Sequence, residues 1–240
     1  FNNLKIMIED IKKQINNHQL IITTHESMIA SSLNLKNVMW IKEENTETLK
    51  DLDDDDSLYF LKSPNNNLLQ YILSEKVILV EGPTEFLLVP KFFKEFYKES
   101  LDSFGINIIS CSGVSYKRYI DIANKMNKKV VIITDNDKNE KNIIEKNKFN
   151  NEHEKIKIFM DESIENWTWE SCFYNLNKEK LDELIVTENE ADYLFHGQDY
   201  GKILGKMLNN KVDTAFIMYN SEYSFTIPDY IKKALEWIKE

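Results

Sequence analysis

The chain has little of several residue types that often assign a protein to a class. Only two of its 240 residues are cysteine, and Arg118 is its single arginine. Cys111 and Cys172 have no spacing typical of a zinc site, so they predict reduced thiols and a cytoplasmic location. No apolar run approaches the ~20 residues of a membrane helix, and no membrane partner is expected.

Positive charge is also scarce. Lys and Arg number 30 against 40 Asp and Glu, which gives a formal net charge of -10. An acidic body attracts nucleic acid poorly overall, but a local basic track or bound cations can offset that charge near a site. The sequence also lacks a Gly-x-x-x-x-Gly-Lys-Ser/Thr phosphate loop, so this chain alone is expected not to bind ATP.

Two short apolar runs, Val77–Val80 and Val130–Ile133, end abruptly in carboxylates. Runs of this kind are typical of strands buried on both faces of a parallel sheet. The first leads into Glu81-Gly82-Pro83-Thr84-Glu85 and the second into Asp135-Asn136-Asp137. Ligands bind at the carboxyl ends of such strands, and carboxylates gathered there need a cation. Oxygen ligands suit Mg²⁺ or Mn²⁺, so the pattern predicts a divalent-metal site.

Strands and helices alternate regularly from residue 76. This spacing predicts βαβ units and an α/β fold, with a mainly parallel, Rossmann-like sheet flanked by helices. Beyond residue 165 the chain is expected to be mainly helical, ending in an amphipathic helix after Pro228. The expected strands are residues 19–23, 38–41, 77–80, 106–109, 129–134 and 155–159, and the expected helices are residues 4–15, 68–73, 84–97 and 116–126.

Glu81-Gly82 after one strand and Asp135-x-Asp137 after a later one resemble the Toprim domain of topoisomerases, bacterial primases and OLD-family nucleases. The form Glu-Gly-Pro-Thr-Glu resembles the OLD family in particular. The resemblance implies a two-metal DNA endonuclease acting on double-stranded DNA. It also implies that Glu81, Glu85, Asp135 and Asp137 bind the metal and that Glu81 is catalytic. A lone Asp-x-Asp after a strand is otherwise an ordinary capped loop.

Two downstream segments extend the resemblance. Trp167-Thr-Trp-Glu170 resembles the Thr-Leu-Glu of OLD proteins, which implies that Glu170 serves a second metal. An acid in the first turn of a helix, stabilised by the helix dipole, is an equally good interpretation. Lys211-Val-Asp-Thr-Ala215 resembles the family's Lys-x-x-x-Ala, which implies that Lys211 steadies charge on the cleaved phosphate. Asp213 is then a further candidate ligand, although a helix start on the surface accounts for the segment as well.

Three other motifs have weaker signals. Thr24-His25-Glu26-Ser27 resembles the switch-histidine loop of ABC-type ATPases, which implies that His25 senses nucleotide; a histidine after a strand is otherwise structural. Lys117 and Arg118 are candidate DNA-phosphate contacts or simply a solvated helix face. Ser112-Gly113 is a candidate phosphate approach or a plain turn.

The resemblance divides the chain into four parts and implies partners. Residues 1–50 are expected to be the C-terminal piece of an ABC-type ATPase domain, 51–75 a junction, 76–165 the Toprim core, and 166–240 its completion with a helical part. The overall look is most similar to the Gabija anti-phage endonuclease subunits. That similarity implies a homo-oligomer, a UvrD-like helicase partner and ATP regulation of the intact protein.

Two other functions stay open at this point. A catalytically silent Toprim module could serve assembly or partner binding, and it is favoured if the acids do not converge. A nucleotidyl-transfer, primase-like Toprim would need a basic template-binding face and a zinc finger, both of which are missing from this sequence.

Overall fold

The computed structural model describes residues 68–111, 116–186 and 193–240, with shorter stretches nearer the N-terminus (residues 6, 7, 10, 11, 13, 21–24, 35–41, 46–48, 50 and 53). The chain divides into two compact units. The first comprises residues 1–74 and 118–127, and the second comprises residues 75–117 and 128–240. The parallel sheet and the predicted metal ligands belong to the second unit.

The first unit contains short elements. A 3-10 turn, η1 (Leu35–Asn37), precedes β1 (Met39–Ile41), which pairs antiparallel with β2 (Thr46–Thr48). Helix α4 (Leu68–Leu73) packs on α6 (Tyr116–Lys125), most of which lies in this unit. The Tyr71 and Tyr119 rings meet edge to face at 4.9 Å, and the Tyr71 hydroxyl donates to the Tyr119 carbonyl at 2.8 Å.

A four-stranded parallel sheet forms the centre of the second unit. Its strands lie in the order β4-β3-β5-β6, so β3 and β5 occupy the middle. The strands are β3 (Lys76–Val80), β4 (Ile106–Ser110), β5 (Lys129–Ile133) and β6 (Ile156–Phe159). Beyond their first residues, Lys76 and Lys129, both central strands are apolar on each face and buried, as the continuous hydrophobic runs predict.

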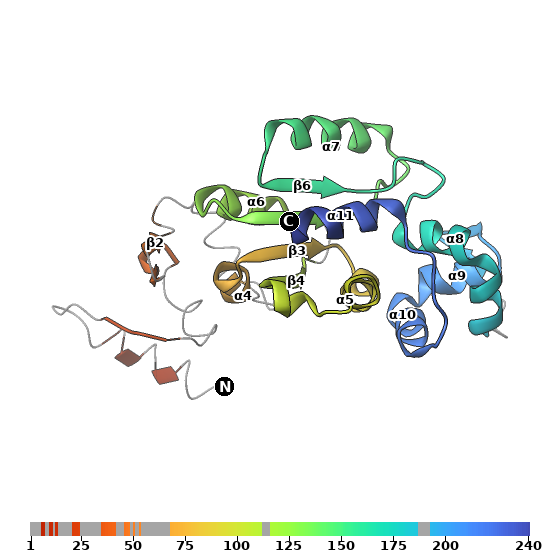
Figure 1. Cartoon of the computed structure of the whole chain (residues 1–240), viewed down its shortest axis with the longest axis horizontal. Helices are drawn as coiled ribbons and strands as arrows, with labels where there is room; N and C mark the ends of the chain where they lie inside the picture. The colour runs from red at the N-terminus through yellow and green to blue at the C-terminus, as the bar shows by residue number, and fades with distance from the viewer. Residues whose placement is uncertain are drawn as a thin grey trace. The chain divides into compact units, whose positions relative to one another are not determined.

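Helices cover the sheet and extend beyond its carboxyl end. Helix α5 packs on β3 and β4, α11 packs on β3, β5 and β6, and α7 packs on β6. Figure 1 shows α8, α9 and α10 gathered beyond the carboxyl ends of the strands. The bounds are α5 (Pro83–Tyr97), η2 (Leu101–Phe104), α7 (Glu140–Glu152), α8 (Trp169–Leu184), β7 (Leu194–Phe195), β8 (Gln198–Asp199), α9 (Lys202–Asn209), α10 (Lys211–Asn220) and α11 (Asp229–Lys239).

One apolar cluster joins the sheet to these helices. Alternate strand residues on one face, such as Ile78 and Val131, share this cluster with Phe92 of α5, Phe173 of α8 and Leu235 of α11. Full burial of each such side chain contributes about 1.5–3 kcal/mol. The core therefore fixes the helix ends that surround the carboxyl edge of the sheet.

Most of the predicted elements are confirmed. The four parallel strands lie within one or two residues of the expected ranges, and α5 and α6 begin within a residue of theirs. The strand expected at residues 19–23 is wrong where it can be checked, because residues 21–24 have no regular structure. Helix α7 and the β7–β8 hairpin were not expected. No described helix is both long enough and apolar enough to span a membrane.

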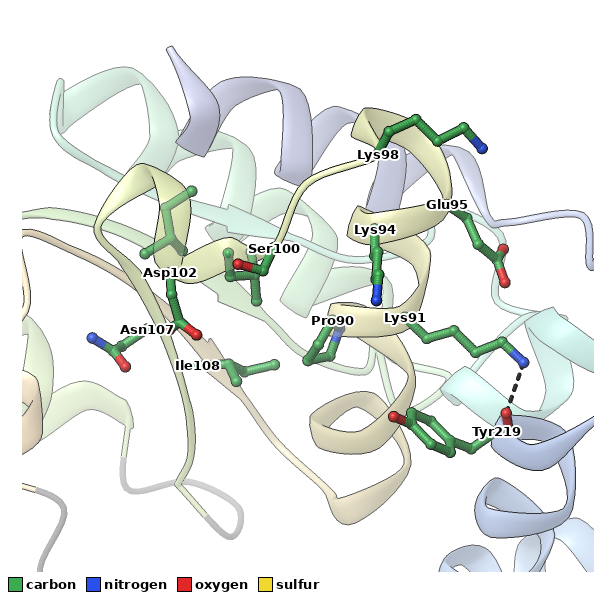
Figure 2. Close-up of a pocket in the computed structure, with 12 residues that line it drawn as sticks. Pro90, Lys91, Lys94, Glu95, Lys98, Ser100, Asp102, Asn107, Ile108 and Tyr219 are labelled. Atoms are coloured by element: carbon green, nitrogen blue, oxygen red, sulfur yellow. Dashed lines mark hydrogen bonds between the residues drawn. The ribbon is translucent and has the colours of Figure 1, made fainter.

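A hollow of about 690 Å³ lies beside the C-terminal half of α5 and edge strand β4 (Figure 2). Its helical side is lined by three lysines, Lys91, Lys94 and Lys98, together with Glu95. One of them, Lys91, reaches across to α10 and donates to the carbonyls of Met218, Tyr219 and Ser221 at 3.1, 2.8 and 3.1 Å. The last carbonyls of a helix have no intrahelical donor, so Lys91 caps α10 and joins it to α5.

Replacing Lys91 by methionine is expected to lower the free energy of unfolding by about 1 kcal/mol. A hydrogen bond from a charged group contributes more to stability when it is buried. Because the Lys91 side chain is partly exposed, the expected loss is about 1 kcal/mol and no more. Urea unfolding followed by circular dichroism measures the change. The matched variant Lys94→Met removes an exposed lysine one turn along the same helix and is expected to have little effect. Equal losses in the two variants would contradict the capping role.

Candidate metal centre

The two acid-bearing strands are neighbours, and their last residues are in register. Val80 of β3 pairs with Ile133 of β5, so Glu81 and Thr134 leave the sheet side by side. The Thr134 hydroxyl donates to Glu81 Oε2 at 2.6 Å, and the Asp135 backbone N–H donates to the same oxygen at 3.3 Å. The sequence prediction that Glu81 and Asp135 follow adjacent strand ends is confirmed.

Helix α5 begins directly after Glu81 and brings in a second glutamate. Gly82 is its N-cap, Pro83 follows, and Glu85 lies in the first turn with only 4% of its surface exposed. A Cβ added to Gly82 would lie 2.9 Å from Glu85 Oε2. The glycine therefore leaves room for this carboxylate to fold back over the start of its own helix, where the helix dipole favours negative charge.

Glu170 reaches the same place from α8. The helix starts with a capping box in which Thr168 and Ser171 satisfy each other's backbone groups, and this fixes Glu170 in the first turn. Its carboxylate is 1% exposed, and Oε1 accepts a hydrogen bond from the Thr84 hydroxyl at 3.0 Å. Oε2 forms an ion pair at 2.9 Å with Nζ of Lys211, the first residue of α10.

The Asp135–Asp137 loop is anchored to the segment before α8. The Trp169 backbone N–H donates to Asp135 Oδ1 at 2.8 Å, and the Asp137 backbone N–H donates to the Trp167 carbonyl at 3.1 Å. Asp135 is half-buried and Asp137 is exposed. One aspartate therefore faces the protein donors while the other faces solvent at the rim.

The pKa values of the inner acids are raised. Burial, followed by the charge of Glu170, raises the pKa of Glu85 from 4.5 to about 7. Burial raises the pKa of Asp135 well above its usual value, and the charges of Glu85, Glu170 and Glu81 add to the rise. Burial and the charge of Glu81 also raise the pKa of Asp137. These acids therefore lie close enough to repel one another.

Lys211 is the cation that opposes this repulsion. Its own burial lowers the pKa of the ammonium, but the charges of Glu170, Asp135 and Glu85 outweigh burial, so the pKa is raised. Lys211 thus stays protonated beside these three carboxylates.

Sequence reasoning missed the groups that hold the acids in place. Thr84 and Thr134 donate to Glu170 and Glu81, and both have little exposed surface. Cys111 is buried next to Glu81, and burial and that charge raise the pKa of its thiol to about 12. A small polar residue directly after a buried strand was the one signal that could have pointed to Thr134.

The other sequence candidates lie elsewhere or are not described. Asp213 is exposed on α10 and is not among the groups that act on the pKa values above. Lys117 is exposed, and Arg118 belongs to the first unit. His25 and Ser112-Gly113 lie outside the described residues. The roles suggested for these residues stay predictions.

The residues at this edge suit a divalent cation, although they do not form a finished coordination shell. Within the described ranges, no three Asp, Glu, His or Cys side chains lie close enough together to hold an ion as they stand. Glu81, Asp135 and Glu170 instead accept hydrogen bonds from protein donors. However, Lys211 is the one cation among the described residues that acts on Glu85, Asp135 and Asp137, and it is already paired with Glu170. This excess of hard oxygen donors is what Mg²⁺ or Mn²⁺ would neutralise.

Comparisons with known proteins agree with this geometry. Residues 72–137, which include Glu81, Asp135 and Asp137, match the family model for the TOPRIM domain of overcoming lysogenization defect (OLD) protein-like proteins. The chain therefore contains an OLD-like Toprim domain. No curated protein matches the chain in sequence.

Solved structures are similar in fold. The C-terminal region of the Burkholderia pseudomallei OLD protein is 20% identical with a TM-score of 0.50, over 70% of this chain and 98% of that one. The corresponding region from Xanthomonas campestris pv. campestris is 23% identical with a TM-score of 0.49, over 69% and 92%. The first likeness supports the Toprim fold beyond the residues that the family model matches.

Replacing Glu85 by glutamine is expected to stabilise the metal-free protein at alkaline pH. Because the folded-state pKa is raised from 4.5 to about 7, the unfolded chain ionises first and stability falls as the pH rises through that window. The glutamine variant escapes a penalty of roughly 1–3 kcal/mol at about pH 8.5 and almost none at about pH 4.5.

Urea unfolding in EDTA at the two pH values measures this difference. Glu99→Gln removes an exposed glutamate just past the end of α5 and serves as the matched control. A gain for Glu85→Gln that does not change with pH would show that the carboxylate is not under the repulsion described here.

Proposed function

We propose that this chain is the nuclease part of a divalent-metal-dependent DNA endonuclease. An OLD-like Toprim domain is consistent with nuclease-type function in general. The observation that carries the finer proposal is the cluster of Glu81, Glu85, Asp135, Asp137 and Glu170 around one lysine at the carboxyl edge of the sheet. Phosphodiester hydrolysis by metal ions needs such a set of oxygen ligands on several elements.

Each acid has a proposed role. Glu81, Asp135 and Asp137 would hold one Mg²⁺ or Mn²⁺ ion, and Glu85 and Glu170 would hold a second one deeper in the site. Bound ions of this kind supply an activated water and neutralise charge on phosphate oxygens. The chain's own donors orient the ligands: the Thr134 hydroxyl directs Glu81, and the Trp169 N–H directs Asp135.

Lys211 has a proposed role of its own. Its ammonium pairs with Glu170 and remains partly exposed, with 35% of its side chain accessible. A cation in that position can steady the negative charge that builds up on a phosphate during cleavage. Lysine suits the role because its ammonium is a compact point charge.

The wider biological setting is proposed from the resemblance alone. We place the chain in a cytoplasmic anti-phage protein of the Gabija kind, which cleaves double-stranded DNA, forms a homo-oligomer and works with a UvrD-like helicase. In that setting residues 1–50 belong to an ABC-type ATPase domain, and ATP regulates the intact protein. Asp213 as a further ligand, His25 as nucleotide sensor, and Lys117 and Arg118 as DNA contacts complete this proposal.

One observation favours a second candidate, a catalytically silent module for assembly or partner binding. Glu81 and Asp135 accept hydrogen bonds from protein donors, and the acids of the described residues do not form a ready coordination shell. In that case the cluster would be a structural network that binds no ion. A DNA cleavage assay separates the two functions.

Glu81→Gln is expected to lower cleavage of supercoiled plasmid DNA in Mg²⁺ or Mn²⁺ by roughly a hundredfold or more. Glutamine still accepts the hydrogen bonds from Thr134 and Asp135, so the fold is expected to remain intact. Gel electrophoresis of nicked and linear products measures the rate.

The control for this experiment is Glu99→Gln, which removes one exposed carboxylate away from the site. It is expected to cleave at the unmutated rate. Cleavage by Glu81→Gln at the rate of the unmutated chain would sink the nuclease proposal. Absence of both metal binding and cleavage in the unmutated chain would favour the silent module.

Lys211→Met is expected to slow cleavage by about ten- to a hundredfold while leaving Mn²⁺ binding at least as tight. Loss of the ammonium leaves the Glu170 carboxylate without its counter-charge, which favours binding of a cation. Lys202→Met is the matched control. It removes the same charge, but the Lys202 ammonium lies over an aromatic ring, 5.6 Å from the centroid of Tyr193. Cleavage and Mn²⁺ titration on both variants give the comparison. A slower rate in Lys202→Met alone would move the role to that lysine.

A further inference from the structure

The Asp135–Asp137 loop has an unusual backbone. Asp137 and Lys138 both have positive φ angles, 57° and 59°. Residues with side chains rarely adopt this left-handed conformation, and each costs on the order of 1 kcal/mol. Two such residues in succession need neighbouring groups that hold the backbone in this conformation. One of the two, Asp137, is the acid at the rim of the site.

The first restraint is the side chain of Asn136, the residue between the two aspartates. It is 1% exposed, and its amide lies within hydrogen-bond distance of the carbonyls of Asp161, Ser163 and Asn166 at 2.9, 2.9 and 3.3 Å. Its Oδ1 accepts from the Lys138 backbone N–H at 2.9 Å. Asn136 therefore fastens the inner side of the loop to the segment before α8.

The second restraint is the side chain of Lys138. Its ammonium donates to the Tyr200 hydroxyl at 3.0 Å and lies over the Trp167 and Tyr200 rings, 4.5 and 5.3 Å from their centroids. The two rings lie 5.8 Å apart, with Phe195 beside Trp167 at 6.1 Å. Lys138 is thus clamped between aromatic rings from two separate segments.

These rings are fixed to the rest of the second unit. Phe195 and Gln198 flank a two-residue turn in which His196 and Gly197 both have positive φ, the geometry that closes a tight hairpin. The Tyr200 hydroxyl donates to Gln198 Oε1 at 2.6 Å, and Asn209 of α9 donates to the Leu194 carbonyl at 2.8 Å. These bonds connect the β7–β8 hairpin to Tyr200 on one side and to α9 on the other.

Asp137 lies between these two restraints, and its N–H donates to the carbonyl of the same Trp167. We infer that Lys138 is a positioning residue: its clamp on Trp167 and Tyr200 sets the Asp137 carboxylate for a divalent cation. This inference rests on the proposed metal site. It assigns to the β7–β8 hairpin a role in forming that site, although no residue of the hairpin is a ligand.

The charge of Lys138 makes the test sharp. A lysine near an acidic site repels a metal ion, so its removal should tighten binding if charge alone matters. If Lys138 positions Asp137, its removal should weaken binding, because supporting groups around metal ligands affect affinity about tenfold. The two explanations differ in the sign of the change.

The experiment is a Mn²⁺ titration of the full chain, followed by electron paramagnetic resonance of free Mn²⁺. Lys138→Met is expected to weaken binding about tenfold. Lys138→Arg is expected to restore most of it, because a guanidinium can stack on Trp167 and donate to Tyr200. Lys141→Met, an exposed lysine three residues along, removes the same charge without the clamp and is expected to leave binding equal or tighter. Equal or tighter binding by Lys138→Met would overturn the inference.

A second measurement separates this inference from the proposed function. Amide hydrogen exchange at Asp137 in EDTA is expected to be faster in Lys138→Met than in the unmutated chain and unchanged in Lys141→Met. If the unmutated chain binds no Mn²⁺, the proposed function fails, and unaltered exchange would then overturn the clamp as well. Tyr200→Phe, which keeps the ring and loses the hydroxyl, replaces Lys138→Met if that variant does not fold, and a two- to threefold weakening is expected of it, about the loss of one hydrogen bond.

Discussion

Carboxylates repel one another when they are withdrawn from water, and the second unit brings five of them to one edge of its sheet. The parallel register of β3 and β5 accounts for two of them, because Val80 and Ile133 end side by side. Glu81 follows Val80 directly, and Asp135 comes two residues after Ile133. Burial adds to the repulsion by removing the solvent that would screen it. Burial and the neighbouring carboxylates together raise the pKa values of Glu85 and Asp135.

The surrounding structure offsets the repulsion with fixed donors. Threonine hydroxyls donate to Glu81 and Glu170, and a backbone N–H donates to Asp135. Lys211 supplies the charge that these neutral donors lack. Each donor depends on an element boundary: Thr84 on the start of α5, Trp169 on the start of α8, and Lys211 on the start of α10. The apolar core that fixes those helix ends therefore also fixes the site.

The sequence predicts the sheet well because its information is local. Continuous apolar runs such as Val77–Val80 can hardly be anything but buried strands, and acids at their ends must share an edge. Helix α7 was missed because it has almost no apolar face, with Lys146 as its one buried residue. The hairpin at His196 and Gly197 was missed because its strands are two residues each, too short for a pattern of alternation.

Tertiary pairings were beyond the reach of sequence patterns. Glu170 and Lys211 were each named as candidates, but their ion pair joins residues far apart in the chain, and no local pattern encodes it. The same holds for Asn136, which reads as a spacer between two aspartates. Its amide in fact satisfies carbonyls in the segment before α8. The anchoring role of Asn136 can be recognised only when the positions of these carbonyls are known.

The five acids form an inner and an outer group that differ in their exposure to solvent. Glu85 and Glu170 are almost fully buried, whereas Asp137 lies exposed at the rim and Glu81 and Asp135 lie between. The inner group is compensated by Lys211 and by helix starts, which cannot move without disturbing the core. The outer group is held by the Asp135–Asp137 loop, whose left-handed residues depend on side chains outside the sheet. The rigid part of the site is therefore encoded by the core, and its solvent-facing part by the segment before α8 and the β7–β8 hairpin.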